Sequence, residues 1–213
     1  MITDPQFSYL TVSQDEWVNR LATYLSEPRL FHSIRVAQTA YRLATYWNVN
    51  PTHAWIAGLL HDIAKEMNPD HLTQLGIKTS TGVSTLFQSY KPIWHAFAAP
   101  YLLTDLFHIR SAAILGAVRW HSTGRSAMTP LEKVIYLADY VEPERSFSHR
   151  DYMTSLTYDS LDVAMWAVST SSLLFLLKNR GAIHPKTIDC RNYYAYQVPP
   201  HQLEEGRSIL WTS

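Results

Sequence analysis

The stretch HAWIAGLLHDIAKEM, residues 53–67, decides the fold. It is apolar up to Leu60 and lies between two Asn-Pro pairs, at 50–51 and 68–69. Asparagine caps helix N-termini and proline is favoured at the first helical position, so a buried helix is expected between these pairs. His61 and Asp62 lie near its end, where an imidazole and a carboxylate in an apolar setting cost several kcal/mol (roughly 2–7) unless a partner or an ion satisfies them.

Helical spacing of apolar residues continues on both sides of this stretch. No segment shows the period-two alternation that is typical of half-buried strands, so the predicted fold class is all-α. A short helix plus a loop is expected over 68–92, and the tail after Pro185 has no clear period. The other expected helices cover about 14–26, 28–47, 93–107, 110–121, 130–142 and 154–179.

Composition excludes several classes of protein. The 213 residues suggest one domain, or one domain with a short appendage. Eighteen basic residues balance eighteen acidic ones, which argues against a nucleic-acid or membrane partner. The longest run without a charged residue or a histidine, Val163–Leu177, is 15 residues long, and a membrane span needs about 20, so a buried helix is expected there. The single cysteine, Cys190, and the absence of a signal-peptide pattern at the N-terminus favour a cytoplasmic location.

Four histidines and two aspartates lie in apolar contexts on five of the predicted helices. Each alone is more often a satisfied core residue or a helix-end polar group than a ligand. Together they match the way in which helix bundles build metal sites from facing helices. Six ligands would saturate one ion, whereas two ions that share a carboxylate keep open positions for water and phosphate. Imidazole and carboxylate without thiolate favour iron, manganese or magnesium over structural zinc. The six residues are His32, His61, Asp62, His95, His121 and Asp139.

Polar residues next to these candidates are candidates for anion binding. Lys65 follows His61 by four residues, so the two side chains can project in the same direction. Ser122-Thr123-Gly124-Arg125 comes directly after His121, and Arg145 lies six residues beyond Asp139. A guanidinium can bind phosphate oxygens with two parallel hydrogen bonds. The alternative is an ordinary polar turn with a solvated arginine.

The order of these residues resembles the four-ligand signature of the HD superfamily of metal-dependent phosphohydrolases, with His32, then His61-Asp62, then Asp139. Further segments resemble one branch of it, the YqeK-type family of symmetrical dinucleoside tetraphosphate hydrolases. The resemblance covers about residues 28–190. Its segments are HSIRVA at 32–37, GLLHDIAKE at 58–66, HAFAA at 95–99, AVRWHSTGR at 117–125 and YLADYVEPER at 136–145, with IHPKTIDCRNY at 183–193.

The resemblance implies a helical HD-domain bundle with two divalent metal ions, iron before manganese or magnesium, in its core cleft. It implies that His32, His61, Asp62 and Asp139 hold one ion, and that Asp62, His95 and His121 hold the other. It also implies symmetrical cleavage of diadenosine tetraphosphate into two ADP. The implied substrate contacts are Lys65, Thr123, Gly124, Arg125 and Arg145.

The residues expected to act in catalysis are Asp62, Lys65 and Arg125. Lys65 and Arg125 are cations beside the metal ions and would neutralise charge that develops at phosphate, whereas Asp62 would be the ligand that the two ions share. The alternatives are a broader nucleotidase or phosphodiesterase, a non-catalytic nucleotide-binding regulator, and a di-iron oxygenase. The expected organisation is an N-terminal helical extension over 1–27, an HD domain over 28–195 and a tail over 196–213, and a homodimer is compatible with it. Pro100 departs from the pattern and is expected to bend the segment that carries His95.

Overall fold

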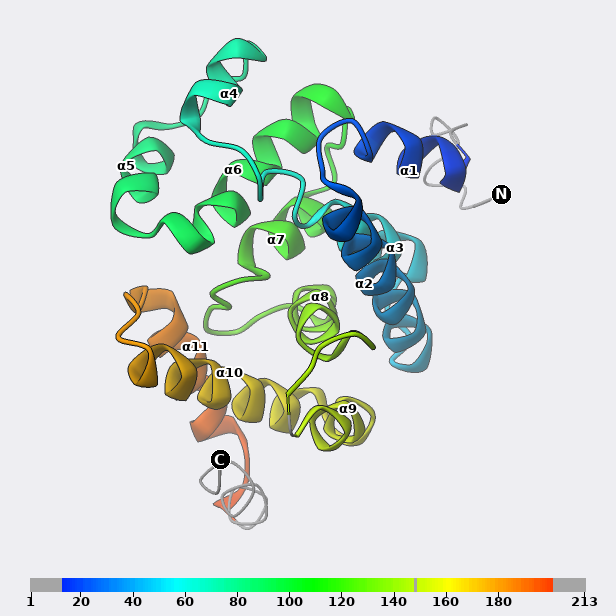
Figure 1. Cartoon of the computed structure of the whole chain (residues 1–213). Helices are drawn as coiled ribbons and strands as arrows, with labels where there is room; N and C mark the ends of the chain where they lie inside the picture. Colours follow the sequence, from blue (N-terminus) through cyan, green and yellow to red (C-terminus); the bar gives the residue numbers. More distant parts are fainter. Residues whose placement is uncertain (1–12, 148, 201–213) are drawn as a thin grey trace.

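The structure, a computed structural model, describes residues 13–147 and 149–200. These residues form eleven helices and no strand, which confirms the predicted all-α fold (Figure 1). The helices are α1 (Gln14–Leu21), α2 (Glu27–Tyr46), α3 (Pro51–Leu60), α4 (Pro69–Gln74), α5 (Thr81–Ser89), α6 (Lys91–Leu106), α7 (Ala112–Trp120), α8 (Pro130–Val141), α9 (Arg150–Asp159), α10 (Leu161–Lys178) and α11 (Pro185–Gln197).

Side-chain caps start the helices that the site depends on. Asn50 accepts a hydrogen bond from the backbone of His53 and is followed by Pro51, so α3 begins where the sequence predicts. Thr129 and Glu132 form a capping box at the start of α8. The side chain of each residue accepts a hydrogen bond from the backbone N–H of the other. These caps fix the N-terminal ends of α3 and α8, and thereby the register of the residues at their C-terminal ends.

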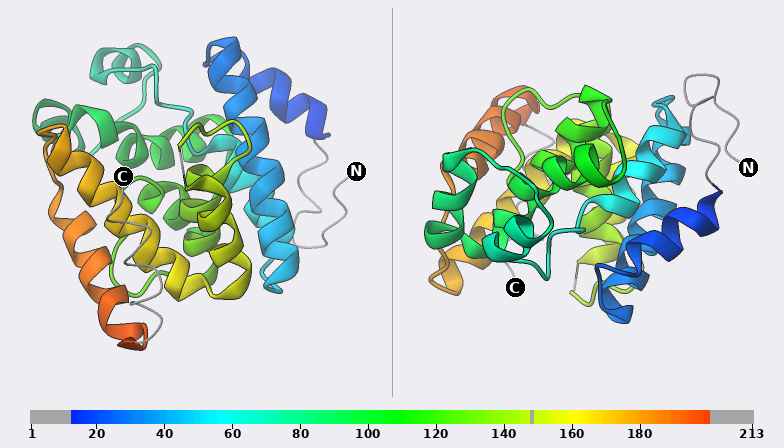
Figure 2. Two further views of the ribbon diagram at one scale, coloured as in Figure 1. Left: turned by 60° about the horizontal axis from the view of Figure 1, so that its bottom comes forward. Right: turned by 90° about the horizontal axis from the view of Figure 1, so that it is seen from above.

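Helix α8 lies at the centre of the bundle, between two hydrophobic cores (Figure 1). Val134, Ile135 and Ala138 pack into the larger core, to which α1, α2, α3, α6 and α7 contribute. Leu137 and Val141 pack into the smaller core with α9, α10 and α11. Figure 2 shows α10 and α11 side by side on this second side of α8, where the two helices are in contact. Because α8 is enclosed on both sides, a polar residue on it is held in place by two cores.

Gly58 lets α2 and α3 approach closely. A Cβ atom at this position would lie only 2.9 Å from the Cα of Ala37 on α2, so any larger residue would push the helices apart. On α3 this contact lies at Gly58, three residues before His61, and on α2 it lies at Ala37, five residues after His32. It therefore brings the polar end of α3 against α2.

Three predicted helix boundaries are wrong in informative ways. The predicted helix over 154–179 is two helices, because the Ser160 side chain caps the start of α10. Helix α1 ends at Leu21 and not near residue 26, and α3 ends at Leu60 and not just before Asn68. His61 and Asp62 therefore lie in the turn that follows α3. Two helices, α4 and α5, lie within 68–92, where one was expected, and α11 covers residues 185–197 of the tail to which no structure was assigned.

Pro100 lies within α6, which continues through it from Lys91 to Leu106. The loss of one backbone donor is thus tolerated in the interior of this helix, although proline usually kinks or breaks a helix. Among the described residues, one helix, α10, is long and apolar enough to cross a membrane by length and composition alone. Core helices pass the same test, and its first half, residues 163–170, is buried. Of the predicted extension and tail, residues 1–12 and 201–213 lie outside the described part of the chain.

Candidate metal centre

Five helices bring the six predicted ligands into one cluster. His61 and Asp62 follow α3 directly and His121 follows α7, so three of the six lie at helix C-terminal ends. The other three lie within helices. All except Asp139 are buried. The helical members are His32 on α2, His95 on α6 and Asp139 on α8.

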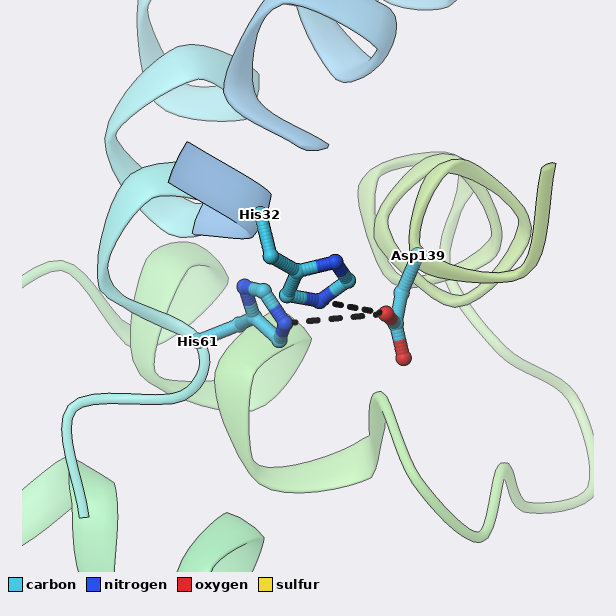
Figure 3. Close-up of side chains that lie close together, drawn as sticks. All are labelled: His32, His61 and Asp139. Atoms are coloured by element: carbon cyan, nitrogen blue, oxygen red, sulfur yellow. Dashed lines mark ion pairs between the residues drawn. The ribbon is translucent and has the colours of Figure 1, made fainter. Parts of the chain in front are cut away.

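The first group consists of His32, His61 and Asp139, whose side chains point toward one another (Figure 3). Their ligand atoms all lie within 4.8 Å of one another. The Oδ1 atom of Asp139 is 3.1 Å from Nε2 of His32 and 3.7 Å from Nε2 of His61. Two imidazoles and a carboxylate therefore converge from three separate elements.

The second group consists of His95 and His121 with Asp62. The two Nε2 atoms of the histidines are 3.1 Å apart. Oδ1 of Asp62 lies 3.0 Å from Nε2 of His95 and 3.6 Å from Nε2 of His121. All three side chains are buried, so little water is available to satisfy these atoms.

Asp62 joins the two groups, because its two oxygens face in different directions. Oδ1 faces His95 and His121, whereas Oδ2 lies 3.5 Å from Nε2 of His61 and 3.8 Å from Nε2 of His32. A carboxylate with one oxygen in each group has the geometry of a bridging ligand between two ions.

The orientation of the rings suits metal binding. Nδ1 of His61 lies 2.7 Å from the carbonyl of Gly58, and Nδ1 of His121 lies 2.7 Å from the carbonyl of Val118. A carbonyl only accepts, so each Nδ1 carries a proton, and Nε2 of each ring faces the cluster. Nε2 of His32, Nε2 of His61 and Oδ1 of Asp62 are buried and form no hydrogen bond within the described residues. A divalent cation would satisfy these atoms, and the donor set fits one.

Burial sets the protonation of the cluster. It lowers the pKa of His61 to about 4 and that of His95 to about 4, so both rings are neutral at neutral pH. Burial alone would favour a protonated Asp62, but the histidines around it hold its pKa well below the usual value. Neutral imidazoles and an ionised carboxylate are the protonation states that ligate metal ions.

Three cationic side chains surround the cluster. Arg29 donates to Oδ2 of Asp62 at 2.9 Å, and Arg145 donates to Oδ1 of Asp139 at 2.6 Å. Nζ of Lys65 lies 3.9 Å from Oδ1 of Asp62 and 3.3 Å from Nε2 of His95. The structure thus places Lys65 and Arg145 beside the predicted ligands and adds Arg29, which the sequence did not suggest.

The sequence profile of the HD domain matches residues 29–144, which is more than half of the chain. The chain belongs to the HD domain family. The profile spans all six clustered residues together with Arg29 and Lys65, and it ends one residue before Arg145.

Relatives of this HD domain protein cover most of its length. The symmetrical bis(5'-nucleosyl)-tetraphosphatase of Staphylococcus aureus is 34% identical over 81% of this chain and 89% of its own. The protein of the same name from Bacillus subtilis is 31% identical over 85% of this chain and 97% of its own. A crystal structure of a "predicted HD superfamily hydrolase involved in NAD metabolism" from Clostridium acetobutylicum is similar with a TM-score of 0.77. That structure is 31% identical and covers 88% of this chain and 99% of its own.

A cavity of about 400 Å³ opens beside the first group of the HD domain. His32 forms part of its wall, together with the two arginines that contact the ligand carboxylates. The wall thus carries charges of both signs next to the cluster. Its residues are Ser26, Pro28, Arg29, His32, Glu66, Glu142, Glu144, Arg145 and Ser146.

The loop after His121 is built differently from the sequence-based expectation. The buried hydroxyl of Thr123 donates to the carbonyl of Gly124. Gly124 has φ +62°, and a Cβ atom there would lie 2.5 Å from Sγ of Cys190 on α11. The close approach that requires glycine is therefore to α11. Ser122, which the sequence places in the candidate anion-binding stretch but not among the substrate contacts, directs its Oγ toward the second group, 3.2 Å from Nε2 of His95 and 3.0 Å from Nε2 of His121.

Arg125 pairs with Glu132 at the start of α8. Its Nη2 donates to both carboxylate oxygens of Glu132, at 3.1 and 2.7 Å, and its Nη1 donates to the carbonyl of Ser126. The HD domain structure brings Lys65 and Arg145 to the ligand cluster but engages Arg125 in the capping region of α8.

This pairing predicts a structural effect for Arg125→Ala. We expect the free energy of unfolding to fall by about 1–3 kcal/mol, because a buried carboxylate loses a charge-assisted partner. Metal content should stay unchanged and kcat/KM should change by less than about tenfold. Urea unfolding and steady-state kinetics check this, with Arg125→Lys expected to recover part of the stability. Unchanged stability with a loss of tenfold or more in kcat/KM would favour the phosphate contact expected from the sequence.

Proposed function

We propose that this HD domain protein is a hydrolase that cleaves diadenosine tetraphosphate and related dinucleoside tetraphosphates symmetrically into two nucleoside diphosphates. The observation that carries the proposal is the position of Asp62 between two histidine-containing groups. The similarity to two enzymes named as symmetrical tetraphosphatases, over nearly their whole lengths, supports the substrate class.

The proposed cofactor is a pair of divalent metal ions, with iron favoured and manganese or magnesium as alternatives. His32, His61, Asp62 and Asp139 would hold one ion, and Asp62, His95 and His121 the other. Bound ions would supply Lewis acidity toward phosphate oxygens and toward water. His61 and His95, which burial keeps neutral, and the ionised Asp62 are prepared for that role without a change of protonation.

The cations of the site are proposed to bind the polyphosphate. Arg29 and Arg145 lie on the wall of the cavity, and each guanidinium donates a hydrogen bond to a carboxylate there. A guanidinium binds a pair of phosphate oxygens in the same way as it binds the two oxygens of a carboxylate. Lys65 lies on the side of the second group and would offset charge on the leaving phosphate. Direct substrate contacts by Thr123, Gly124 and Arg125 stay predictions, since their observed contacts are within the protein.

We place the catalytic unit at residues 28–195, which include every member of the cluster and residues 185–195 of α11, against which the His121 loop packs. A cytoplasmic location, the lack of a nucleic-acid or membrane partner, and a homodimer stay predictions from the sequence.

Product analysis tests the proposed function. Protein loaded anaerobically with Fe²⁺ is incubated with diadenosine tetraphosphate, and the nucleotides are separated by chromatography. We expect ADP as the only product. ATP plus AMP would mean asymmetrical cleavage, and binding without turnover would favour a nucleotide-binding regulator. Comparable turnover of mononucleotides would favour a broader nucleotidase.

A further inference from the structure

The histidines of the cluster differ in how their Nδ1 atoms are held. His61 and His121 use carbonyls three residues earlier in their own chain segments, Gly58 and Val118. His32 instead directs Nδ1 to a side chain 110 residues away, at 3.1 Å from Oε1 of Glu142. The orientation of His32 therefore depends on a side chain that a substitution can remove.

The carboxylate of Glu142 is itself fixed. It is 2% exposed, and its Oε2 accepts from Nε of Arg35 at 2.7 Å and from the backbone of Glu144 at 2.9 Å. These two donors occupy Oε2 and leave Oε1 facing His32. The acidic group is thus held in one orientation by contacts on the side away from the cluster.

Glu142 also lies close to a ligand in the sequence. It caps the C-terminal end of α8, three residues after Asp139. The end of this one helix therefore supplies both Asp139, which faces Nε2 of His32 at 3.1 Å, and Glu142, which faces Nδ1 of the same ring. The imidazole is held between them.

We propose that Glu142 is a positioning residue for His32. Its carboxylate accepts the Nδ1 proton, which fixes the tautomer in which the lone pair of Nε2 points into the first group, and it prevents the ring from rotating away. Outer carboxylates of this kind orient ligand histidines and raise their basicity. The inference rests on the proposed metal centre, but its first test needs no bound metal.

The first test is the tautomer of His32 in metal-free protein, read by nitrogen-15 NMR of the histidine rings at neutral pH. Wild-type protein should show His32 protonated at Nδ1. Glu142→Gln keeps the size of the side chain but replaces the charged acceptor with an amide, and we expect a shifted or mixed tautomer at His32 only. An unchanged tautomer at His32 in this variant would overturn the inference, whatever the protein hydrolyses.

The second test is metal affinity, measured by competition with a chromophoric chelator and Mn²⁺ as the probe. In Glu142→Gln we expect one of the two ions to bind about 10–100-fold more weakly and the other to bind as in wild type. Equal weakening of both ions, or of neither, would contradict the inference. Glu142→Asp, which withdraws the carboxylate by one methylene, should shift affinity in the same direction and serves if the glutamine variant fails to fold.

Glu144→Gln is the matched control. It removes the same charge two residues away, and only its backbone N–H contacts Glu142. We expect wild-type tautomers and wild-type metal affinity. A weakening equal to that of Glu142→Gln would assign the effect to the charge of the segment and would overturn the positioning role. Because neither readout involves a nucleotide, failure here leaves the proposed hydrolase activity to its own test.

Discussion

Replacing Asp62 with alanine is expected to remove both metal ions and nearly all activity. One oxygen of this carboxylate faces His95 and His121, and the other faces His32 and His61, so both ions lose a ligand at once. The loss of several kcal/mol of transition-state stabilisation corresponds to a decrease in kcat/KM of at least about 10³-fold. Elemental analysis of purified, folded protein measures the metal content, and hydrolysis of diadenosine tetraphosphate measures the activity.

Asp105→Ala is the control for this variant, because Asp105 is exposed on α6. It should retain two ions per chain and wild-type turnover. Circular dichroism should show that both variants keep their helical content. Two ions still bound to Asp62→Ala would rule out Asp62 as the shared ligand.

Replacing His121 with asparagine is expected to remove one ion and leave the other. Asparagine is too short to place an atom at the position of Nε2, which lies 3.1 Å from Nε2 of His95 in the second group. The first group keeps both of its histidines and its own carboxylate, Asp139. We expect about half of the wild-type metal content and a loss in kcat of about 10²-fold or more, since a second ion typically stabilises the leaving oxygen.

His108→Asn is the matched substitution elsewhere in the chain. His108 is exposed and has φ +54°, a conformation that asparagine tolerates. Metal content and turnover should be those of wild type. If His121→Asn and its partner variant His95→Asn hydrolyse the substrate at the wild-type rate, a mechanism with two ions is wrong.

Much of the fold follows from local sequence. Asn50-Pro51 and Thr129-Pro130 predict the starts of α3 and α8 to the residue, because caps and first-turn prolines act over one helical turn. Ser160 was missed because apolar residues at helical spacing, Leu156 before it and Val163 after it, continue across the break, and a single serine is weak evidence for a break. The helix α11 was missed because its buried face is narrow, with Thr187, Cys190 and Tyr194 as its buried residues.

The clustering of the six histidine and aspartate side chains could be predicted because these residue types are conspicuous among apolar residues. The roles of Arg29 and Glu142 could not be predicted, since each acts through a partner far away in the chain, Asp62 and His32. Local context does not reveal such pairs. The same limit explains why the pairing of Arg125 was not predicted. Its partner, Glu132, was expected only as a residue of the helix over 130–142.

The arrangement of the two ions is tested most directly by anomalous X-ray diffraction from crystals of the iron-loaded protein, with data collected on both sides of the iron absorption edge. We expect two anomalous peaks in each chain. One should lie among His32, His61, Asp62 and Asp139, and the other among Asp62, His95 and His121, with one oxygen of Asp62 directed to each. A single peak, or two peaks of which only one contacts Asp62, would contradict the shared carboxylate on which the proposed function depends.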